Sequence, residues 1–428
     1  MTLHTQTEDG VFVGSSSPAG SKKAMMVMTA LFFMCGFLGT LNDILIPHLK
    51  SLFVLNYAQV MLVQFSFFSS FLIFSYPSGK LVERIGSQKT LVAGLLTMGT
   101  GALLFLPASR VPSFVLFMIA LVVLAGGVTA LQVSGNPYVS VLGPARTASS
   151  RLNLTQAFNS LGSTAAPAFG GALILRATGS TAVDYASRLS GAASHAYKVQ
   201  QASYVQKPYI LIALTLFTLG IIVACQKLPA ILNTERSQSG KLRSLWSYPH
   251  VTLGIVAIFL YCGAEITIGS FLVNYISQPS IGAMTARSAS AYVSIYWGGS
   301  MVGRFIGSAL LRVVKTGMLV SFNAVVALLL VIATITSHGH MAMWTILLVG
   351  AFNSIMFPSL FTLGIANLGA LTGKASGVLM SGAVGAAVIP VIQGMVADKI
   401  GVHSSFLVPA ICYLYVAFYG LKGCHLSR

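Results

Sequence analysis

Charge is the scarcest property of this sequence. Lys, Arg, Asp and Glu together make up 8% of the 428 residues, whereas 55% are hydrophobic and the mean hydropathy is +0.82. A water-soluble chain of this length carries about three times as large a share of charged residues. The composition therefore excludes a water-soluble globular protein and indicates a helical protein that crosses a membrane many times.

Catalytic and metal-binding motifs are also absent. The five cysteines form no CxxC pair, and most of them lie in apolar stretches, which is typical of small buried residues without disulfides or metal. There is no GxSxG, no histidine pair at metal-binding spacing and no phosphate-binding glycine loop. We therefore expect no enzyme activity, no cofactor and no structural metal.

The net charge of +17 does not indicate nucleic-acid binding, because the basic residues are spread over many short connecting segments. Residues 1–24 are mostly polar and lack the apolar core and cleavage site of a signal peptide, so we expect a cytosolic tail.

Twelve apolar runs follow, each about twenty residues long, the length that crosses the hydrocarbon of a bilayer. They lie near 25–48, 57–79, 90–107, 112–135, 153–176, 209–227, 250–276, 290–311, 317–336, 341–365, 375–397 and 403–421. A polar stretch at 228–249 separates the sixth run from the seventh. The sequence thus predicts an N-terminal six-helix bundle over 25–227, a cytosolic linker, and a C-terminal bundle over 250–428 that ends in a short cytosolic tail.

The distribution of Lys and Arg predicts the orientation. With the N-terminus in the cytosol, 17 of the 25 basic residues fall in cytosolic segments and 8 on the opposite side, so both termini are expected in the cytosol. A second insertion, at about 177–207, is rich in Ala and Ser and is predicted to be an external surface loop.

The two halves carry matching patterns. Run four has Gln132, Pro137 and Gly143, and run ten has Asn353, Pro358 and Gly364, at identical offsets. A Gly followed by Arg five residues later stands after run two (Gly79, Arg84) and after run eight (Gly307, Arg312). With twelve spans, these matches predict two parallel six-helix repeats, the architecture of the major facilitators.

The segment GKLVERIGSQK, residues 79–89, resembles the major facilitator loop between the second and third helices, with Glu83 where Asp is usual. Its glycines allow a tight turn, and Glu83 with Arg84 can form a gate network on the cytosolic side. The predicted gating residues are Gly79, Glu83, Arg84, Arg304 and Arg312.

Only two of the eight acidic residues fall well inside apolar runs, Asp43 in the first and Glu265 in the seventh. An ionisable group at membrane depth costs several kcal/mol and therefore marks a functional site. We predict that Asp43 couples the movement of a cation to transport and that Glu265 is a second coupling candidate. Glu265 has two alternative roles, a hydrogen bond to substrate or an ion pair with a distant Lys or Arg.

Amides form the clearest polar pattern. Gln132 and Asn136 share a helical face in run four, and Asn153, Gln156, Asn159 and Ser163 repeat every three to four residues in run five. Such amides often form hydrogen bonds between membrane helices, and each bond stabilises the helix contact by about 0.6 to 2 kcal/mol. A whole stripe, together with Asp43, favours a binding site, because amides both donate and accept and so suit a neutral polyol. In run eight, Trp297 is a candidate for stacking on a sugar ring.

At these residues the chain resembles the fucose/proton symporter family of the major facilitators. LNDILIPHLK (41–50), LQVSGNPYVSVL (131–142) and LNLTQAFNSLG (152–162) resemble the family, and GAEITIGSFLV (263–273) and FNSIMFPSLF (352–361) resemble its bacterial glucose/galactose branch. The resemblance implies alternating access around a central sugar site. It implies that Asp43 matches the essential acid of the first helix, and that Gln156 and Asn159 line the sugar cavity.

One departure from the fucose symporters matters. They carry a glutamate at the position of Gln132, and that acid is implicated in their proton and sugar handling. Gln132 does not titrate, so their two-acid scheme does not carry over. The glucose/galactose branch resembles this sequence in having Gln there, and sodium dependence is known within it.

The leading hypothesis is a multi-pass protein of the bacterial inner membrane that imports glucose or galactose by symport with Na⁺ or H⁺. It is expected to act as a monomer within the lipid bilayer, and if Na⁺ is the ion, its site lies near Asp43. The predicted substrate-binding residues are Asn42, Gln132, Asn136, Gln156, Asn159, Trp297 and Asn353.

Three alternatives remain open: an L-fucose/proton symporter, a proton-coupled drug exporter on the same fold, and a sugar receptor that transports nothing. The amide stripe argues against the drug exporter, whose cavity is expected to be mostly apolar.

Overall fold

The computed structural model of the protein describes residues 18–53, 57–111, 113–173, 199–200, 203, 205–226, 228, 244–284 and 286–425. Within these ranges, the side chains of residues 18–20, 41–48, 50–52, 57–62, 64, 167–173, 286, 287, 290 and 370 lie outside the description. Most of the predicted N-terminal tail, of the 177–207 insertion and of the linker also lies outside the described residues. Every regular element in the described part is helical, which confirms the predicted fold class.

Six helices form the first half of the molecule, called the N-half from here on. They are α1 (Pro18–Phe53), α2 (Tyr57–Ile85), α3 (Ser87–Arg110), α4 (Phe114–Val141), α5 (Ala148–Leu173) and α8 (Gln206–Cys225). Helix α1 begins seven residues before the first apolar run, and its first residue is a proline, which the first turn of a helix tolerates. The short helix η1 (Ala145–Thr147) joins α4 to α5.

The second half, the C-half, follows η4 (Leu245–Ser247) and has six spans, two of them interrupted. The spans are α9 (Pro249–Ile276), α10 (Ala286–Leu310), α11 (Thr316–Thr336), α12 with α13 (Gly339–Asn353, Met356–Gly364), α14 with α15 (Thr372–Ser381, Gly385–Ser405) and α16 (Leu407–Leu421). The short helices η5 (Gly369–Leu371), η6 (Gly382–Val384) and η7 (Gly423–His425) lie between or after them.

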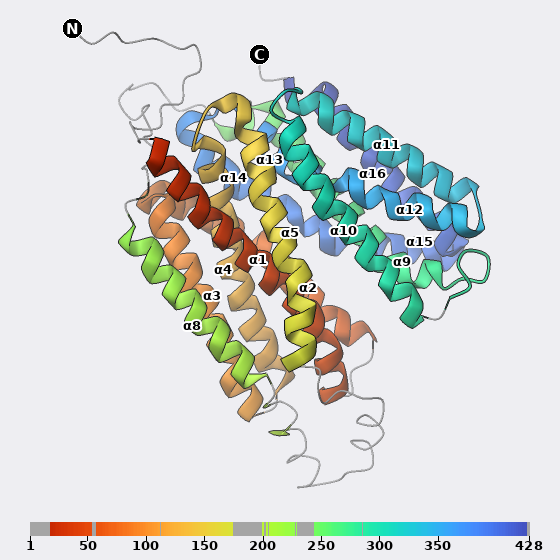
Figure 1. The fold of residues 1–428 in the computed structure, drawn as a ribbon, viewed down its shortest axis with the longest axis horizontal. Helices are drawn as coiled ribbons and strands as arrows, with labels where there is room; N and C mark the ends of the chain where they lie inside the picture. Colours follow the sequence, from red (N-terminus) through yellow and green to blue (C-terminus); the bar gives the residue numbers. More distant parts are fainter. Residues whose placement is uncertain are drawn as a thin grey trace.

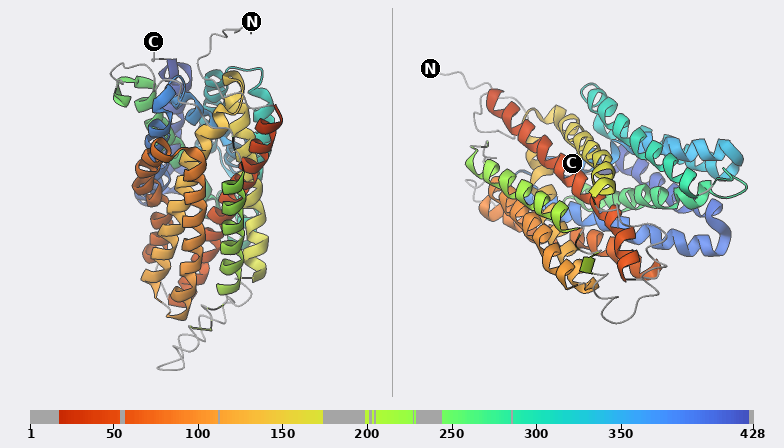
Figure 2. Two further views of the ribbon diagram at one scale, coloured as in Figure 1. Left: turned by 90° about the vertical axis from the view of Figure 1, so that its left-hand side faces the viewer. Right: turned by 60° about the horizontal axis from the view of Figure 1, so that its bottom comes forward.

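The two halves lie side by side, as the ribbons of Figures 1 and 2 show. The junction between them is built from α5 against α10 and from α2 and α4 against α14. Nine stretches of the described residues are long and apolar enough to cross a membrane, and α2, α5 and α10 are not among them.

One end of the molecule serves as a reference for the rest of the description. Helices α2, α4 and α8 end there, and α3, α5 and α9 begin there, so the connection between the halves lies at this end. It is called the linker side. The turn from α4 to α5 on the linker side is held by one arginine, Arg151, whose guanidinium donates to the carbonyls of Val139 (3.2 Å) and Pro144 (2.9 Å). Arg151 thus satisfies carbonyls that the end of α4 leaves without partners.

The tenth span is broken where the sequence predicted one continuous run. Pro358 has no backbone N–H, so the carbonyl of Ser354, four residues earlier, loses its helical partner. The helix stops at Asn353 and restarts at Met356. The eleventh span is also broken, between α14 and α15, where Gly382 and Gly385 bring the backbone against α9. Such breaks persist inside a membrane protein only where other groups satisfy the freed carbonyls.

Helices α1 and α5 cross in close contact because each presents a glycine to the other. A Cβ at Gly36 would collide with the carbonyl of Asn159, and a Cβ at Gly162 would collide with the carbonyl of Phe33. Close approach through small residues is the usual way in which membrane helices gain packing energy. This crossing fixes α1, the helix that contains Asp43, to the amide-bearing helix α5.

We expect Gly36→Ala to destabilise the protein by about 1–3 kcal/mol, because the added methyl group forces apart two packed backbones. Gly298→Ala is the matched control, since Gly298 also lies within a helix and a Cβ added there would have no atom within 4 Å. Thermal unfolding of both variants in detergent measures the difference. Equal melting temperatures for the two variants would contradict the role given to this crossing.

Candidate functional site

Small hydroxyl side chains join the halves on the linker side. Ser150 at the start of α5 and Ser308 at the end of α10 exchange hydrogen bonds, each hydroxyl donating to the other residue's carbonyl, at 2.6 and 3.0 Å. The hydroxyls of Ser149 and Thr362 lie 2.6 Å apart, and Thr316 donates to Ser149 at 3.0 Å. These four contacts are all buried or partly buried, and they hold α5 against three helices of the C-half.

The predicted gating glycine, Gly79, lies at a second junction on this side. A Cβ at Gly79 would stand 2.9 Å from the carbonyl oxygen of Gly373, and one at Gly377 would stand 2.6 Å from that of Ser75. Helices α2 and α14 therefore cross backbone to backbone. Glu83 flanks this crossing, because a Cβ at Gly373 would lie 3.4 Å from its Cγ. The first turn of α14 is thus beside a carboxylate, which favours its free N–H groups.

The prediction that Glu83 and Arg84 form a gate network stays untested. Arg84 and Arg312 are exposed, and within the described residues the ion pair that forms is Arg304 with Glu265, not Glu83 with Arg84. The orientation count placed Arg304 in a cytosolic segment, but the structure places it inside α10, six residues before that helix ends. Its side chain is 12% exposed.

Pro137 creates a polar contact across the junction. It leaves the carbonyl of Val133 without a helical donor, and the hydroxyl of Ser376 in α14 donates to that carbonyl at 2.6 Å. One turn from there, the fully buried Asn136 donates to the sulfur of Met380 at 3.4 Å. The N-half backbone freed by proline is thus completed by a side chain of the C-half.

The amides of α4 and α5 fall into two groups. Gln156 donates to the side-chain oxygen of Asn136 at 3.4 Å, so these two predicted residues meet, and Gln132 is partly exposed one turn away on α4. Asn159 instead donates to the carbonyl of Phe32 at 3.0 Å, in the crossing with α1. Asn153 donates to the hydroxyl of Ser359 in the C-half at 3.3 Å. The stripe therefore contributes both to helix packing and to a central polar layer.

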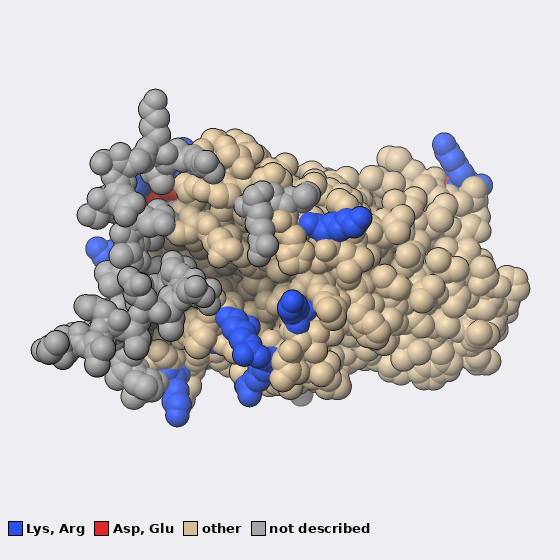
Figure 3. Space-filling model, turned by 90° about the horizontal axis from the view of Figure 1, so that it is seen from above, with Lys and Arg blue, Asp and Glu red and all other residues tan. Residues whose placement is uncertain are grey.

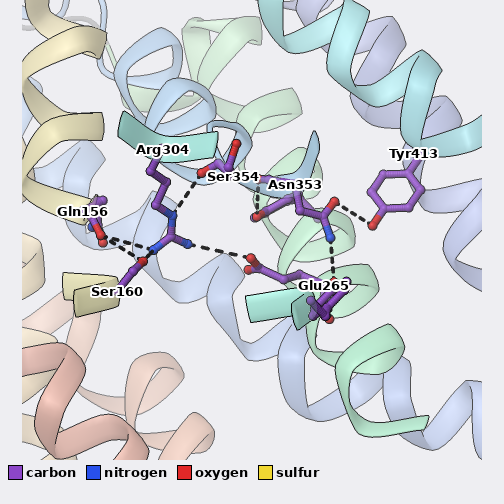
Figure 4. A network of polar contacts seen from close by, with 9 residues as sticks. Gln156, Ser160, Glu265, Arg304, Asn353, Ser354 and Tyr413 are labelled. Carbon is purple, nitrogen blue, oxygen red and sulfur yellow. Dashed lines mark hydrogen bonds and ion pairs between the residues drawn. The ribbon is translucent and has the colours of Figure 1, made fainter. Parts of the chain in front are cut away.

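Arg304 is the centre of this layer, as Figure 4 shows. Its Nε donates to the freed carbonyl of Ser354 at 3.1 Å, and Nη1 donates to the carbonyl of Gln156 at 3.2 Å and to the hydroxyl of Ser160. One guanidinium thus completes the broken tenth span and binds a turn of α5 in the other half. Its Nη2 lies 3.8 Å from Oε1 of Glu265.

Glu265 lies in the middle of α9 and is 8% exposed. Its Oε1 is buried and accepts no hydrogen bond in the described structure. The 3.8 Å separation from Arg304 is an ion-pair distance but too long for a hydrogen bond. Of the two alternative roles left open by the sequence, an ion pair with a basic residue is therefore the one that the geometry supports.

Asn353 is held by tyrosines. Its amide donates to the hydroxyl of Tyr296 (2.8 Å), its side-chain oxygen accepts from Tyr413 (2.8 Å), and its carbonyl accepts from Tyr261 (2.8 Å). All four residues are fully buried. The prediction that Asn353 binds substrate stays untested, and the observed contacts describe a residue that joins four helices of the C-half.

Trp297 is 37% exposed and lies one turn before Met301 on α10, on the face that meets α5. Its ring packs edge-on against Tyr296, with centroids 5.2 Å apart, and beside Gly269, one turn along α9 from Glu265. It therefore borders the central polar layer. Asn42 and Asp43 lie in the backbone of α1, but their side chains are outside the described residues, so their roles stay predictions.

Sequence reasoning missed several residues of this layer. Ser160, Ser354 and Ser376 carry no signal of their own, since serine is common in membrane helices. The missing N–H of each proline was a usable signal, because it identifies the carbonyl four residues earlier as one that needs a donor. That reasoning finds Val133 and Ser354 from the sequence, but not the side chains that bond them.

Comparison with known proteins identifies the family. The profile of the Major Facilitator Superfamily matches residues 27–383. The chain belongs to the Major Facilitator Superfamily. The predicted family is thereby confirmed.

Three individual proteins extend the comparison. The chain is 47% identical to the glucose/galactose transporter of Brucella abortus (biovar 1, strain 9-941) over 422 residues, which cover 98% of this chain and 97% of that protein. It is 30% identical to the L-fucose-proton symporter of Escherichia coli K12 over 409 residues, 93% of each chain. It matches the crystal structure of the transporter FucP in the outward conformation at 29% identity with a TM-score of 0.87, covering 94% of this chain and 99% of that one.

We expect Tyr413→Phe to lower the free energy of unfolding by about 1–2 kcal/mol, because it leaves a buried amide oxygen without its donor. Tyr415→Phe is the matched control, since the Tyr415 hydroxyl bonds a carbonyl at 3.3 Å in a less buried position. Chemical denaturation in detergent measures both variants. A larger loss for Tyr415→Phe would contradict the structural role assigned to the Asn353 cluster.

Proposed function

We propose that the protein is a secondary active transporter that imports a neutral hexose, glucose or galactose, by symport with a cation. The observation that carries this proposal is the 47% identity to a glucose/galactose transporter over 98% of the chain. The layer of amides at the junction of the halves supports it, because amides donate to and accept from the hydroxyls of a sugar.

Two rivals have weaker support. An L-fucose/proton symporter is disfavoured by the lower sequence identity of 30%. It is also disfavoured by Gln132, because the resemblance to the fucose symporters implies a glutamate at this position. A drug exporter is disfavoured by the polar character of the central layer, in which Gln156, Asn136 and Arg304 meet.

The linker side is proposed to face the cytosol of a bacterial inner membrane. In Figure 3, most of the visible Lys and Arg side chains lie in the left and middle of the view, and the surface to their right is uncharged except at its upper edge. The basic residues near the linker side include Lys80, Arg84, Lys89, Arg146, Arg312, Lys315, Lys374 and Lys422, and those near the opposite side include Arg110, Lys207 and Lys399. Such an excess is typical of cytosolic segments.

The described state is proposed to be open to the outside. The hydrogen bonds that Ser149, Ser150 and Ser376 form between the halves lie on the linker side or in the central layer. The likeness to FucP in the outward conformation supports the same assignment. Alternating access then consists of breaking these contacts while the halves close on the opposite side.

Sugar is proposed to bind at the central layer. Gln132, Asn136, Gln156 and Asn159 are the N-half candidates, together with Asn42 in α1, and Trp297 offers a ring face from the C-half. Asn353 is proposed to bind sugar after its side chain releases the hydrogen bonds to Tyr296 and Tyr413. The protein is proposed to act as a monomer.

Asp43 is proposed to couple the cation to transport. It lies in α1, seven residues after Gly36, at which α1 packs on α5. With H⁺ as the ion, Asp43 takes up and releases a proton. With Na⁺, it stays ionised and joins an oxygen cage with amide and carbonyl groups.

We expect Asp43→Asn to abolish accumulation of sugar above its external concentration, because the uncharged amide neither carries a proton nor neutralises Na⁺. Uptake of labelled galactose into proteoliposomes with an imposed cation gradient measures this. Asp398→Asn, the same change at an exposed acid near the end of α15, is expected to transport normally. Undiminished accumulation by Asp43→Asn would overturn the coupling role.

The function itself is tested with the unmodified protein in proteoliposomes. Labelled glucose, galactose and fucose are offered with a pH gradient and a Na⁺ gradient imposed separately. Accumulation of glucose or galactose under one gradient is the expected result and identifies the ion. Accumulation of fucose alone, or binding of sugar without uptake, would overturn the proposal.

A further inference from the structure

Arg304 is the only described residue whose side chain bonds both halves while it also forms an ion pair within one of them. Its partners divide by half. Gln156 and Ser160 belong to α5 in the N-half, whereas Ser354 and Glu265 belong to the C-half. When the halves move as bodies, contacts within a half persist and contacts between halves break. During transport, the contacts of Arg304 with Gln156 and Ser160 are therefore expected to break, whereas its contacts with Ser354 and Glu265 persist.

In the described state the N-half partners are the ones engaged. Nη1 donates to the carbonyl of Gln156 at 3.2 Å and to the hydroxyl of Ser160, and the same turn of α5 carries the Gln156 amide that meets Asn136. Nη2 lies 3.8 Å from Oε1 of Glu265, and this oxygen is buried and accepts no hydrogen bond. A buried carboxylate oxygen without a donor is costly, and a second state in which that oxygen is bonded removes the cost.

Separation of α5 from α10 removes both acceptors of Nη1. The guanidinium then keeps the Ser354 carbonyl as its one remaining hydrogen-bond acceptor and Glu265 at an ion-pair distance of 3.8 Å, and a guanidinium with so few hydrogen bonds at membrane depth is unfavourable. Glu265 is the neighbouring acceptor, and it is in the same half. A shift of about 1 Å in Nη2 converts the present 3.8 Å separation into a charge-assisted hydrogen bond of ordinary length.

Resting on the transport function proposed above, we infer that Arg304 exchanges partners during each transport cycle. It binds Gln156 and Ser160 of α5 while the linker side is closed, and it binds Glu265 when that side opens. Glu265 is thus a positioning residue that acts on Arg304 and stabilises the state open to the linker side. The exchange lets α5, with its sugar-binding amides, part from α10 without leaving a charge unpaired.

The partner exchange predicts that two substitutions change the open fraction in opposite directions, whereas a static ion pair does not. Ser160→Ala removes an acceptor used only in the closed state, so it raises the fraction of molecules open on the linker side. Glu265→Gln weakens the partner used in the open state, so it lowers that fraction. If Glu265 only held Arg304 in place for its bonds to α5, both substitutions would raise the open fraction.

The test measures the distance between spin labels at Lys89→Cys in α3 and Lys422→Cys after α16, two exposed positions in different halves on the linker side. Cys225 and Cys424 are replaced by serine, and double electron–electron resonance in lipid nanodiscs gives the ratio of long to short distances. We expect Ser160→Ala to raise this ratio and Glu265→Gln to lower it, each by about tenfold, which corresponds to one hydrogen bond to a charged group.

Ser163→Ala is the control, because Ser163 lies one turn further along α5 and donates to the carbonyl of Gly36 in α1, a contact inside the N-half that persists when the halves separate. It is expected to leave the ratio unchanged. The double variant Ser160→Ala with Glu265→Gln is expected to return the ratio toward that of the parent. Shifts of the same sign in the two single variants, or no shift in Glu265→Gln, would overturn the inference.

The distance measurement needs no sugar and no ion gradient. If labelled hexoses fail to enter proteoliposomes but the two variants shift in opposite directions, the transport proposal fails in its substrate and the partner exchange stands. If uptake proceeds as proposed and the shifts have the same sign, the partner exchange alone fails.

Discussion

A backbone carbonyl freed inside a membrane has to be bonded by another part of the protein, because no water is there to bond it. This constraint governs the centre of the molecule. Pro137 frees the carbonyl of Val133, and Pro358 frees that of Ser354. Ser376 bonds the first from the opposite half, and Arg304 bonds the second while it also reaches the opposite half. The junction between the halves is therefore assembled around two breaks in helical hydrogen bonding.

The chemistry of the remaining junction fits a contact that has to open and close. On the linker side, hydroxyls such as Ser150 and Ser308 and close glycines such as Gly79 and Gly377 make the contacts. A neutral hydrogen bond contributes about 0.5–1.5 kcal/mol net, and water replaces it when the surface opens. Several such bonds hold the surfaces together, yet none leaves a buried charge behind when the surfaces part. The one charged contact across the junction, within the described residues, is the one with a second partner available.

The sequence was sufficient for the spans, the repeat and the family, because each rests on a local pattern. Apolar length predicts a span, and the offsets around Pro137 and Pro358 predict the repeat. The sequence was insufficient to predict which amides pack helices together and which lie in the central polar layer, because that depends on what lies opposite each residue. Asn159 and Gln156 are three residues apart, yet one bonds the backbone of α1 and the other bonds Asn136. Arg304 illustrates the same limit, since a basic residue near the end of a run resembles a surface residue until its partners are known.

The charges at the centre separate into two kinds. Glu265 and Arg304 lie in the same half and carry opposite charges, so the pair is neutral as a unit and stays together as the halves move. Exchange of partners within that unit moves no net charge across the membrane. Gln132 adds none, because an amide does not ionise. Of the acids placed by the sequence inside membrane spans, Asp43 is therefore the one to which we assign the proposed coupling charge, and the crossing of α1 with α5 at Gly36 ties its helix to the amides that are proposed to bind sugar.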